Sequence, residues 1–153
     1  RDAFRQVGLF RPYLTTGGDA DICWRIQQET GWAIAFAESA VVQHRHRSTL
    51  AELRSQWQRY GRSNQYLHDL HAVPLNPPLS TAESIRRLTR WLLKEIPQHV
   101  LRKSHSSKNH SSNDWITLLS TPLSLWCIHA RSAGQRQAQL ASKAKEIESW
   151  EVR

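Results

Sequence analysis

The sequence predicts a fold that is α/β at the N-terminus and mostly α-helical afterwards. Two short apolar runs, residues 33–36 and 40–43, have the length and composition of buried strands. From residue 49 onward, apolar side chains recur at steps of three and four, which is the period of an amphipathic helix. Hydrophobic residues make up 39% of the 153 positions and include seven tryptophans, so the chain can build a core.

Glycine and proline divide the N-terminal part into elements. Residues 2–7 predict a short helix that Gly8 ends, and residues 9–16 predict a loop around Pro12. The next two residues are glycines, which give the backbone conformational freedom just before a second predicted helix. That helix is expected to run to about Thr30, because the next glycine is a natural C-terminal stop.

Two longer helices are predicted in the middle of the chain. The first ends before Pro74, and one of its faces carries Leu50, Leu53, Trp57, Tyr60, Asn64, Leu67 and His71. A proline-rich loop follows. Ser80 or Thr81 caps the next helix, which is expected to reach Pro97. Its predicted buried stripe is formed by Ile85, Leu88, Leu92 and Ile96.

These elements predict four regions. Residues 1–72 form the α/β part and residues 73–103 form a basic amphipathic helical extension. Residues 104–114 are polar and of low complexity, as in a flexible linker, and residues 115–153 form a helical tail. The most apolar stretch of the tail has only about 14 residues, against the roughly 20 that span a bilayer, so no transmembrane helix is predicted.

Charge and cysteine content narrow the functional classes. The net charge of +8 favours an anionic partner, whether lipid headgroups, nucleotide phosphates or nucleic acid. Cys23 and Cys127 lie far apart, so they predict no disulfide framework, and a reducing, cytoplasmic compartment fits best. The chain has no methionine and its first residues already have the composition of a fold interior, so we expect it to be a fragment that lacks an upstream segment.

Residues 17–48 carry the most specific pattern, which reads GGDADICWRIQQETGWAIAFAESAVVQHRHRS. This segment resembles the C-terminal signature of glycosyltransferase family 2, in which Gly-Gly-Asp leads into Asp-hydrophobic-x-x-Arg, a Gly-aromatic turn, a strand and a strand-end histidine. The matching residues are Gly18, Asp19, Asp21, Ile22, Arg25, Gly31, Trp32 and His44. The resemblance covers about the first third of the chain.

The resemblance implies a partial GT-A, Rossmann-like sheet and an inverting glycosyltransferase. Such an enzyme transfers a sugar from a nucleotide-sugar donor to an acceptor, here a lipid-linked or polysaccharide acceptor at the cytoplasmic membrane face. The matched signature belongs to the acceptor side. We therefore expect this fragment to be inactive without the nucleotide-binding half.

Two carboxylates are the catalytic candidates that the resemblance implies. Asp19 aligns with the base that removes the proton of the acceptor hydroxyl, and Asp21 is the second choice. On a helix these two side chains point about 200° apart, because each residue turns roughly 100°. Asp21 is then better placed to orient Arg25 at i+4 or an acceptor hydroxyl. The alternative for Asp19 is a plain helix cap.

His44 is the candidate metal ligand that the resemblance implies. Sugar transfer of this kind uses a divalent cation, Mg²⁺ or Mn²⁺, to offset the charge of the leaving nucleoside diphosphate. Mg²⁺ prefers oxygen ligands and Mn²⁺ tolerates an imidazole better. The alternative is a solvated His-Arg-His-Arg turn.

Five further residues are candidates for binding the acceptor or phosphate, namely Arg25, Trp24, Arg45, Gln56 and Arg59. Arginine side chains suit a diphosphate because they bind phosphate oxygens in pairs. An aromatic face at Trp24 can stack on a sugar ring, although large aromatic side chains more often pack in a core. The element around Gln56 is similar to the Gln-x-x-Arg-Trp motif of processive members, with Tyr60 in place of the tryptophan, but the match is weak and an ordinary amphipathic helix is the favoured interpretation.

The alternative function is a basic helical module that binds nucleic acid or a membrane surface. A basic series beside Trp91 suits a helix on anionic lipid, and a solvated basic face is an equal alternative; the series is Arg86, Arg87, Arg90, Lys94, Arg102 and Lys103. Nucleic acid is the less favoured partner, because the arginines are dispersed and no recognition motif is present.

Overall fold

A computed structural model describes residues 1–99 and 114–149, and in these ranges it contains helices but no strand. The helices are α1 (Asp2–Val7), α2 (Gly18–Thr30), α3 (Leu50–His71), α4 (Thr81–Arg90) and α6 (Asp114–Gln137). A π-helical turn, η1 (Trp91–Glu95), extends α4, and a 3-10 turn, η2 (Ser142–Lys145), follows α6. The predicted α/β fold with a partial Rossmann-like sheet is therefore wrong for the described residues, which are all-α.

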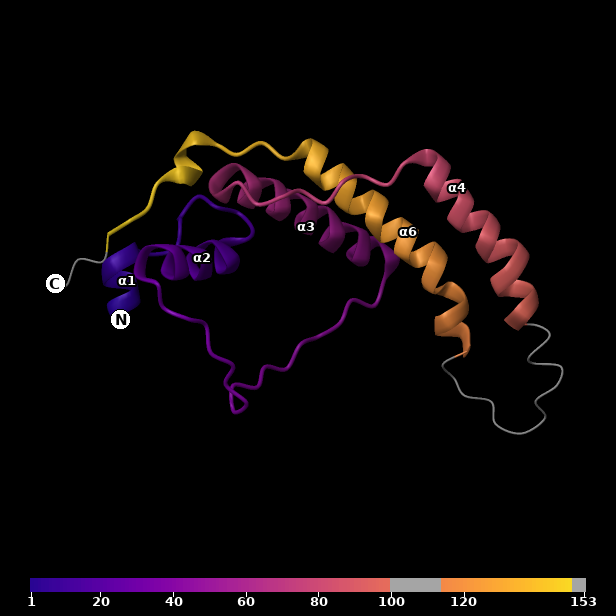
Figure 1. Ribbon diagram of the computed structural model, residues 1–153, viewed down its shortest axis with the longest axis horizontal. Helices are drawn as coiled ribbons and strands as arrows, with labels where there is room; N and C mark the ends of the chain where they lie inside the picture. The colour runs from indigo at the N-terminus through magenta and orange to yellow at the C-terminus, as the bar shows by residue number, and fades with distance from the viewer. Residues whose placement is uncertain (100–113, 150–153) are drawn as a thin grey trace.

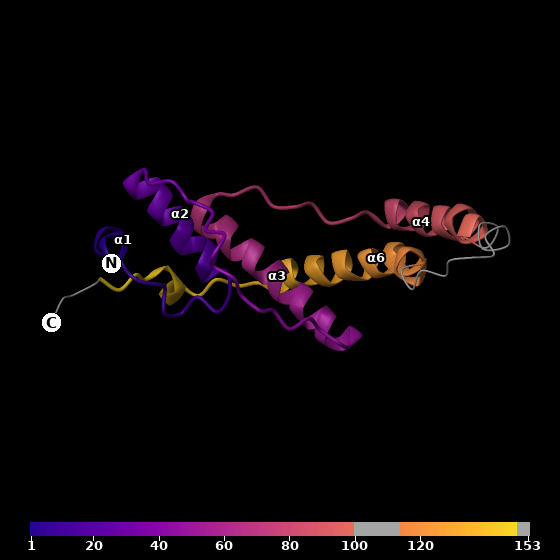
Figure 2. The same cartoon turned by 90° about the horizontal axis from the view of Figure 1, so that it is seen from below.

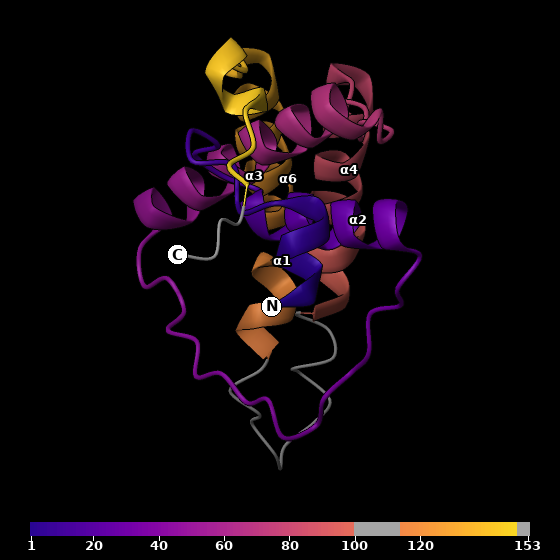
Figure 3. The same cartoon turned by 90° about the vertical axis from the view of Figure 1, so that its left-hand side faces the viewer.

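The two predicted strands, residues 33–36 and 40–43, lie in an exposed connection that we call the 31–49 loop. Figures 1 and 3 show this loop extending away from the helices. Phe36 is 90% exposed and Val42 is 86% exposed. A strand needs a neighbour to take up its N–H and C=O groups, and within the described part of the chain no extended segment supplies one. The two runs are apolar, as buried strands are, but apolar composition alone does not supply a second strand to pair with.

The boundaries predicted for the N-terminal helices are confirmed. Gly8 ends α1, and Gly31 ends α2 in the left-handed conformation at φ 69°. Thr49 caps α3 by accepting a hydrogen bond from the backbone N–H of Glu52. This helix ends at His71, two residues before the predicted limit. Local sequence signals were enough to predict these helix boundaries, because helix caps and stop signals act within one helical turn.

A close crossing joins α3 to α6. Gly61 and Gly134 lie at this crossing, where each faces the backbone of the other helix. A Cβ added at Gly61 would lie 2.0 Å from the carbonyl oxygen of Arg131, and one added at Gly134 would lie 2.0 Å from that of Gln58. The two backbones therefore approach more closely than any side chain at these positions permits.

Helix α4 runs beside α6, as Figures 1 and 2 both show. Pro122 stands inside α6 and has no N–H to donate to the carbonyl of Leu118 four residues earlier. That carbonyl instead accepts a hydrogen bond of 2.7 Å from the indole Nε1 of Trp91. The proline in α6 thus leaves a backbone carbonyl without its helical donor, and this carbonyl binds the Trp91 indole that follows α4. We call α4, η1 and α6 together the α4–α6 arm.

The predicted buried stripe of α4 is wrong. Ile85 is 58% exposed, Leu88 is 42% exposed and Leu92 is 57% exposed. The helix turns a different face to α6, through Ser84, which is buried and lies 3.2 Å from His129 Nε2 through its hydroxyl oxygen. Helical periodicity identified the apolar face correctly, but it did not decide whether that face is covered.

The C-terminal tail returns to the N-terminal helix (Figure 1). The backbone N–H of Leu9 donates to the carbonyl of Glu148 at 2.8 Å, and a guanidinium nitrogen of Arg11 donates to the carbonyl of Lys145. The tail was predicted to be helical over 115–153; in its described part, which ends at residue 149, the α-helix ends at Gln137 and is followed by η2. Of the predicted linker, residues 104–113 lie outside the described residues. None of the described helices has the length and apolar content to cross a bilayer.

Candidate functional site

Asp21 lies at the centre of a buried polar cluster. Its side chain has no solvent exposure, and its Oδ1 accepts a hydrogen bond of 3.0 Å from Nε of Arg11. The Nε2 atom of His71 lies 2.8 Å from the same oxygen, and Nε of Arg25 donates to Oδ2 at 3.1 Å. The cluster joins α2 to the loop after α1 and to the last residue of α3. We call these four residues the Asp21 cluster.

Arg25 extends the cluster to the backbone. One guanidinium nitrogen donates to the carbonyl of Val7 and another donates to that of Leu9 at 2.7 Å, so α2 is tied to the end of α1. The side chain is only 3% exposed. The interpretation that Asp21 orients Arg25 at i+4 is confirmed. Arg25 makes these hydrogen bonds to groups within the protein.

The charge state of Asp21 follows from its surroundings. Burial by itself raises the pKa of this carboxyl, but hydrogen bonds from His71 and Arg11 and the positive charges of Arg11 and Arg25 outweigh burial and leave the pKa below its usual value. A carboxylate held in this way is a weak base. It is also closed to solvent, so it has no access to the proton of a substrate.

Asp19 has the opposite environment. It is exposed in the first turn of α2, where the helix dipole favours a negative charge, and its side chain has no partner among the described residues. The preceding Gly17 is in the left-handed conformation at φ 82°, and a Cβ there would lie 2.4 Å from Oγ of Ser63 on α3. Gly17 therefore lies close to α3, where there is no room for a side chain. The start of α2, with Asp19 open to solvent, thus lies beside a second helix.

His44 and Arg45 lie on the exposed 31–49 loop. The ring of His44 makes an edge contact with that of His46, with centroids 5.6 Å apart. Within the described residues no group of three or more His, Cys, Asp or Glu side chains is arranged to hold a metal ion. These residues therefore do not fit a cation site by themselves.

The remaining sequence-based candidates lie on the faces of α2 and α3. Trp24 is half-buried and makes an edge contact with the His71 ring at 5.4 Å, which is a packing contact. Gln56 donates a hydrogen bond of 2.9 Å to the hydroxyl of Tyr60, one turn later on the same helix. Arg59 is exposed. The structure thus gathers Asp21, Arg25 and Trp24 around one buried cluster and leaves the other candidates on the surface.

Sequence reasoning missed two members of the Asp21 cluster, Arg11 and His71. His71 was placed on the correct face of its helix, but nothing in the spacing links it to a carboxylate 50 residues earlier. The one available signal was the charge of Asp21, because a charged group at an otherwise apolar helix position needs cationic partners.

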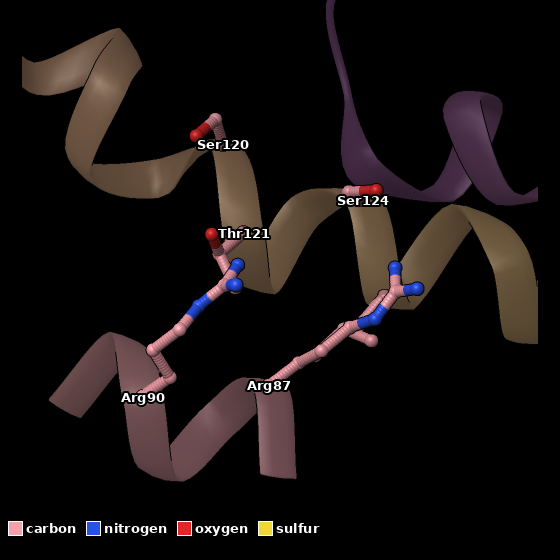
Figure 4. Close-up of a pocket in the computed structure, with 6 residues that line it drawn as sticks. Arg87, Arg90, Ser120, Thr121 and Ser124 are labelled. Carbon is pink, nitrogen blue, oxygen red and sulfur yellow. The ribbon is translucent and has the colours of Figure 1, made fainter. Parts of the chain in front are cut away.

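A second polar feature lies in the α4–α6 arm, at the opposite end of the molecule from α2 (Figure 1). It is a cavity of about 280 Å³ between the two helices. Figure 4 shows Arg87 and Arg90 reaching from α4 toward α6. The lining consists of two arginines, three hydroxyl-bearing residues and one leucine: Arg87, Arg90, Ser120, Thr121, Ser124 and Leu125. The sequence analysis identified the arginines and missed the hydroxyl groups, which come from a helix about thirty positions later.

Acidic side chains hold the two cavity arginines. Nε of Arg87 lies 2.7 Å from a carboxylate oxygen of Glu83, and Nε of Arg90 lies 3.4 Å from one of Glu95. The hydroxyl of Thr121 donates to Glu95 at 2.9 Å. These contacts hold both guanidinium groups at the cavity while part of each donor set stays available.

Comparisons with known proteins add no relative: no family model, no curated protein and no solved structure matches this chain.

Proposed function

We propose that this chain is the acceptor-side part of an inverting, nucleotide-sugar-dependent glycosyltransferase that acts on a lipid-linked or polysaccharide acceptor. The observation that carries the proposal is the division between two carboxylates of one motif. Asp21 is fully buried among three partners, whereas Asp19, two residues earlier, is exposed at the start of α2. The resemblance to family 2 assigns the base to the position that is exposed.

The reaction assigns a simple task to Asp19. As the acceptor hydroxyl oxygen forms a bond to the anomeric carbon, the bond from that carbon to the leaving diphosphate breaks, and the hydroxyl proton passes to the Asp19 carboxylate. Attack from the face opposite the leaving group inverts the anomeric centre. A base at the open end of a helix can reach a bulky acceptor, and a buried base cannot.

Asp21 then serves as a positioning residue. Through Arg25 it ties α2 to the carbonyls of Val7 and Leu9, and through His71 it ties α2 to α3. These contacts fix the direction of the first turn on which Asp19 stands. The nucleotide-binding half required for transfer is part of the proposal and is supplied by further polypeptide.

The test is Asp19→Asn in the protein at the full length that its gene encodes. Loss of the base should lower the rate of sugar transfer by about a hundredfold or more. Binding of the nucleotide-sugar donor, measured by calorimetry, and the unfolding temperature should both stay near their wild-type values, because Asp19 makes no hydrogen bond or ion pair with a described side chain.

The matched control is Glu29→Gln, which also neutralises an exposed carboxylate on α2. This variant should transfer sugar at the wild-type rate. Full activity of the Asp19→Asn protein would remove Asp19 as the base, and equal losses in both variants would point to a general effect of charge on α2.

A further inference from the structure

We infer that the α4–α6 arm docks on the surface of an anionic lipid bilayer, with a headgroup phosphate entering the cavity between α4 and α6. This inference concerns where the protein binds and does not depend on the proposed sugar transfer. It depends on three features of the arm: an uncovered apolar face, a concentration of positive charge, and a cavity with phosphate-binding groups.

The apolar stripe of α4 is the first feature. It consists of Ile85, Leu88, Leu92 and Leu93, of which the last is 70% exposed. Ile85, Leu88 and Leu92 follow the three- and four-residue steps of one helix face, and Leu93 lies next to Leu92 and widens the strip. Covering such a strip removes apolar surface from water, and an acyl-chain boundary covers it without a shaped partner.

Positive charge is the second feature. On the other faces of α4 and η1, four cationic residues outnumber two acidic ones; the cationic residues are Arg86, Arg87, Arg90 and Lys94, and the acidic ones are Glu83 and Glu95. A helix with leucine and isoleucine on one face and arginine on the other is typical of segments that lie in the plane of a membrane surface. Charge complementarity therefore selects anionic lipid as the occupant.

The cavity is the third feature. Arginine binds phosphate through several N–H donors at once, and the hydroxyl of Ser124, which also lines the cavity, can add a donor of its own. Glu83 and Glu95 occupy some of the arginine donors, and a cavity of about 280 Å³ between the helices gives a phosphate group space to reach the others. Arg86 holds Glu83 with two further hydrogen bonds, so Glu83 keeps a partner when Arg87 turns toward a ligand.

A bilayer explains the combination better than nucleic acid does. Nucleic-acid phosphates would use the arginines and hydroxyl groups, but they would gain nothing from the exposed leucines. A headgroup layer has anionic phosphates at its surface and apolar chains directly beneath them. A headgroup layer therefore offers a partner to each of these two features.

The first experiment measures binding of the full chain to sedimented vesicles of phosphatidylcholine with phosphatidylglycerol. The variant Leu88→Asn/Leu92→Asn should bind about tenfold more weakly than wild type, because it removes apolar area from the docking face. Its circular dichroism and unfolding temperature should stay unchanged, since both side chains are exposed.

The matched control is Val41→Asn/Val42→Asn, which removes two exposed apolar side chains from the 31–49 loop. It should bind vesicles as wild type does. Equal weakening in both variants would show that no dedicated face exists and would overturn the inference, as would unchanged binding of the α4 variant.

The second experiment tests the cavity. Arg87→Gln/Arg90→Gln should weaken binding to the anionic vesicles by about tenfold. Arg45→Gln/Arg47→Gln removes the same charge from the 31–49 loop and should weaken it by about twofold or less. Identical losses in the two variants would mean that net charge alone drives binding, which would overturn the role of the cavity.

Two further measurements distinguish a bilayer from other ligands. Millimolar inorganic phosphate at constant ionic strength should leave vesicle binding unchanged, because the site needs the apolar face as well. Displacement by phosphate would assign the cavity to a free anion. A single-stranded oligonucleotide bound more tightly than the vesicles, with no dependence on Leu88 and Leu92, would overturn the bilayer as the partner.

Discussion

The two ends of this molecule depart in opposite ways from the usual pattern of buried apolar and exposed charged side chains. At one end, the Asp21 cluster buries a carboxylate and two arginines, and each charge has partners within 3.1 Å. At the other end, the α4–α6 arm leaves leucine and isoleucine side chains exposed and has a polar cavity that opens to solvent. Complete pairing indicates a structural centre, whereas uncovered apolar surface beside partly used cations indicates a binding surface.

The largest effect is expected at the paired end. Asp21→Ala leaves Arg25 and Arg11 buried without their counter-charge, which should cost about 3–5 kcal/mol of unfolding free energy. Urea denaturation measures it. Asp19→Ala, two residues earlier on the exposed side, should cost well under about 1 kcal/mol. Similar costs for the two variants would contradict the distinction between a buried and an open carboxylate.

A somewhat smaller effect is expected where the two ends meet, at the α3–α6 crossing. Gly61→Ala places a methyl group 2.0 Å from the Arg131 carbonyl oxygen and should cost about 3 kcal/mol, as the helices are forced apart. Gly31→Ala is the control, because its Cβ would meet nothing within 4 Å and only the left-handed backbone is strained. That control should cost about 1 kcal/mol. Thermal unfolding of both variants decides whether crowding or backbone strain dominates.

Acid should weaken the paired end selectively. The folded pKa of Asp21 lies below its ordinary value of 3.8, so the cluster contributes stability that is fully present above that value and is lost as the pH falls through the folded pKa. The difference in unfolding temperature between wild type and Asp21→Asn should therefore shrink between pH 7 and pH 3. The scan stops there because Arg86 and Arg87 lower the pKa of Glu83 to about 2. A constant difference would mean that Asp21 acts through packing and not through charge.

The smallest effect is expected inside the arm. Trp91→Phe keeps an aromatic ring but removes the N–H that bonds to the carbonyl of Leu118, and it should cost about 1 kcal/mol. Trp126→Phe is the control, since this side chain on α6 is 46% exposed. Hydrogen exchange in α4 should speed up in the first variant and not in the second. An equal increase of hydrogen exchange in both variants would show that this hydrogen bond does not hold α4 to α6.

The sequence was reliable for features that one turn of chain decides. The glycine stops at residues 8 and 31 and the cap at Ser80 are where local rules put them, because each depends on backbone conformation and on groups within a few residues. It also identified the i+4 pair of Asp21 and Arg25. Within the candidate site, the sequence identified the residue types correctly but did not show which side chains are buried.

The sequence was wrong where a distant partner decides the outcome. Residues 33–36 and 40–43 have the composition of strands but no strand beside them in the described chain, and the stripe around Leu88 has the period of a buried face but no helix over it. By itself the sequence determined where helices begin and end, because those signals are local. Only the tertiary structure decided that His71 and Arg11 meet Asp21, that α6 supplies hydroxyl groups opposite the α4 arginines, and which apolar faces stay uncovered, because contacts between distant residues depend on how the whole chain packs.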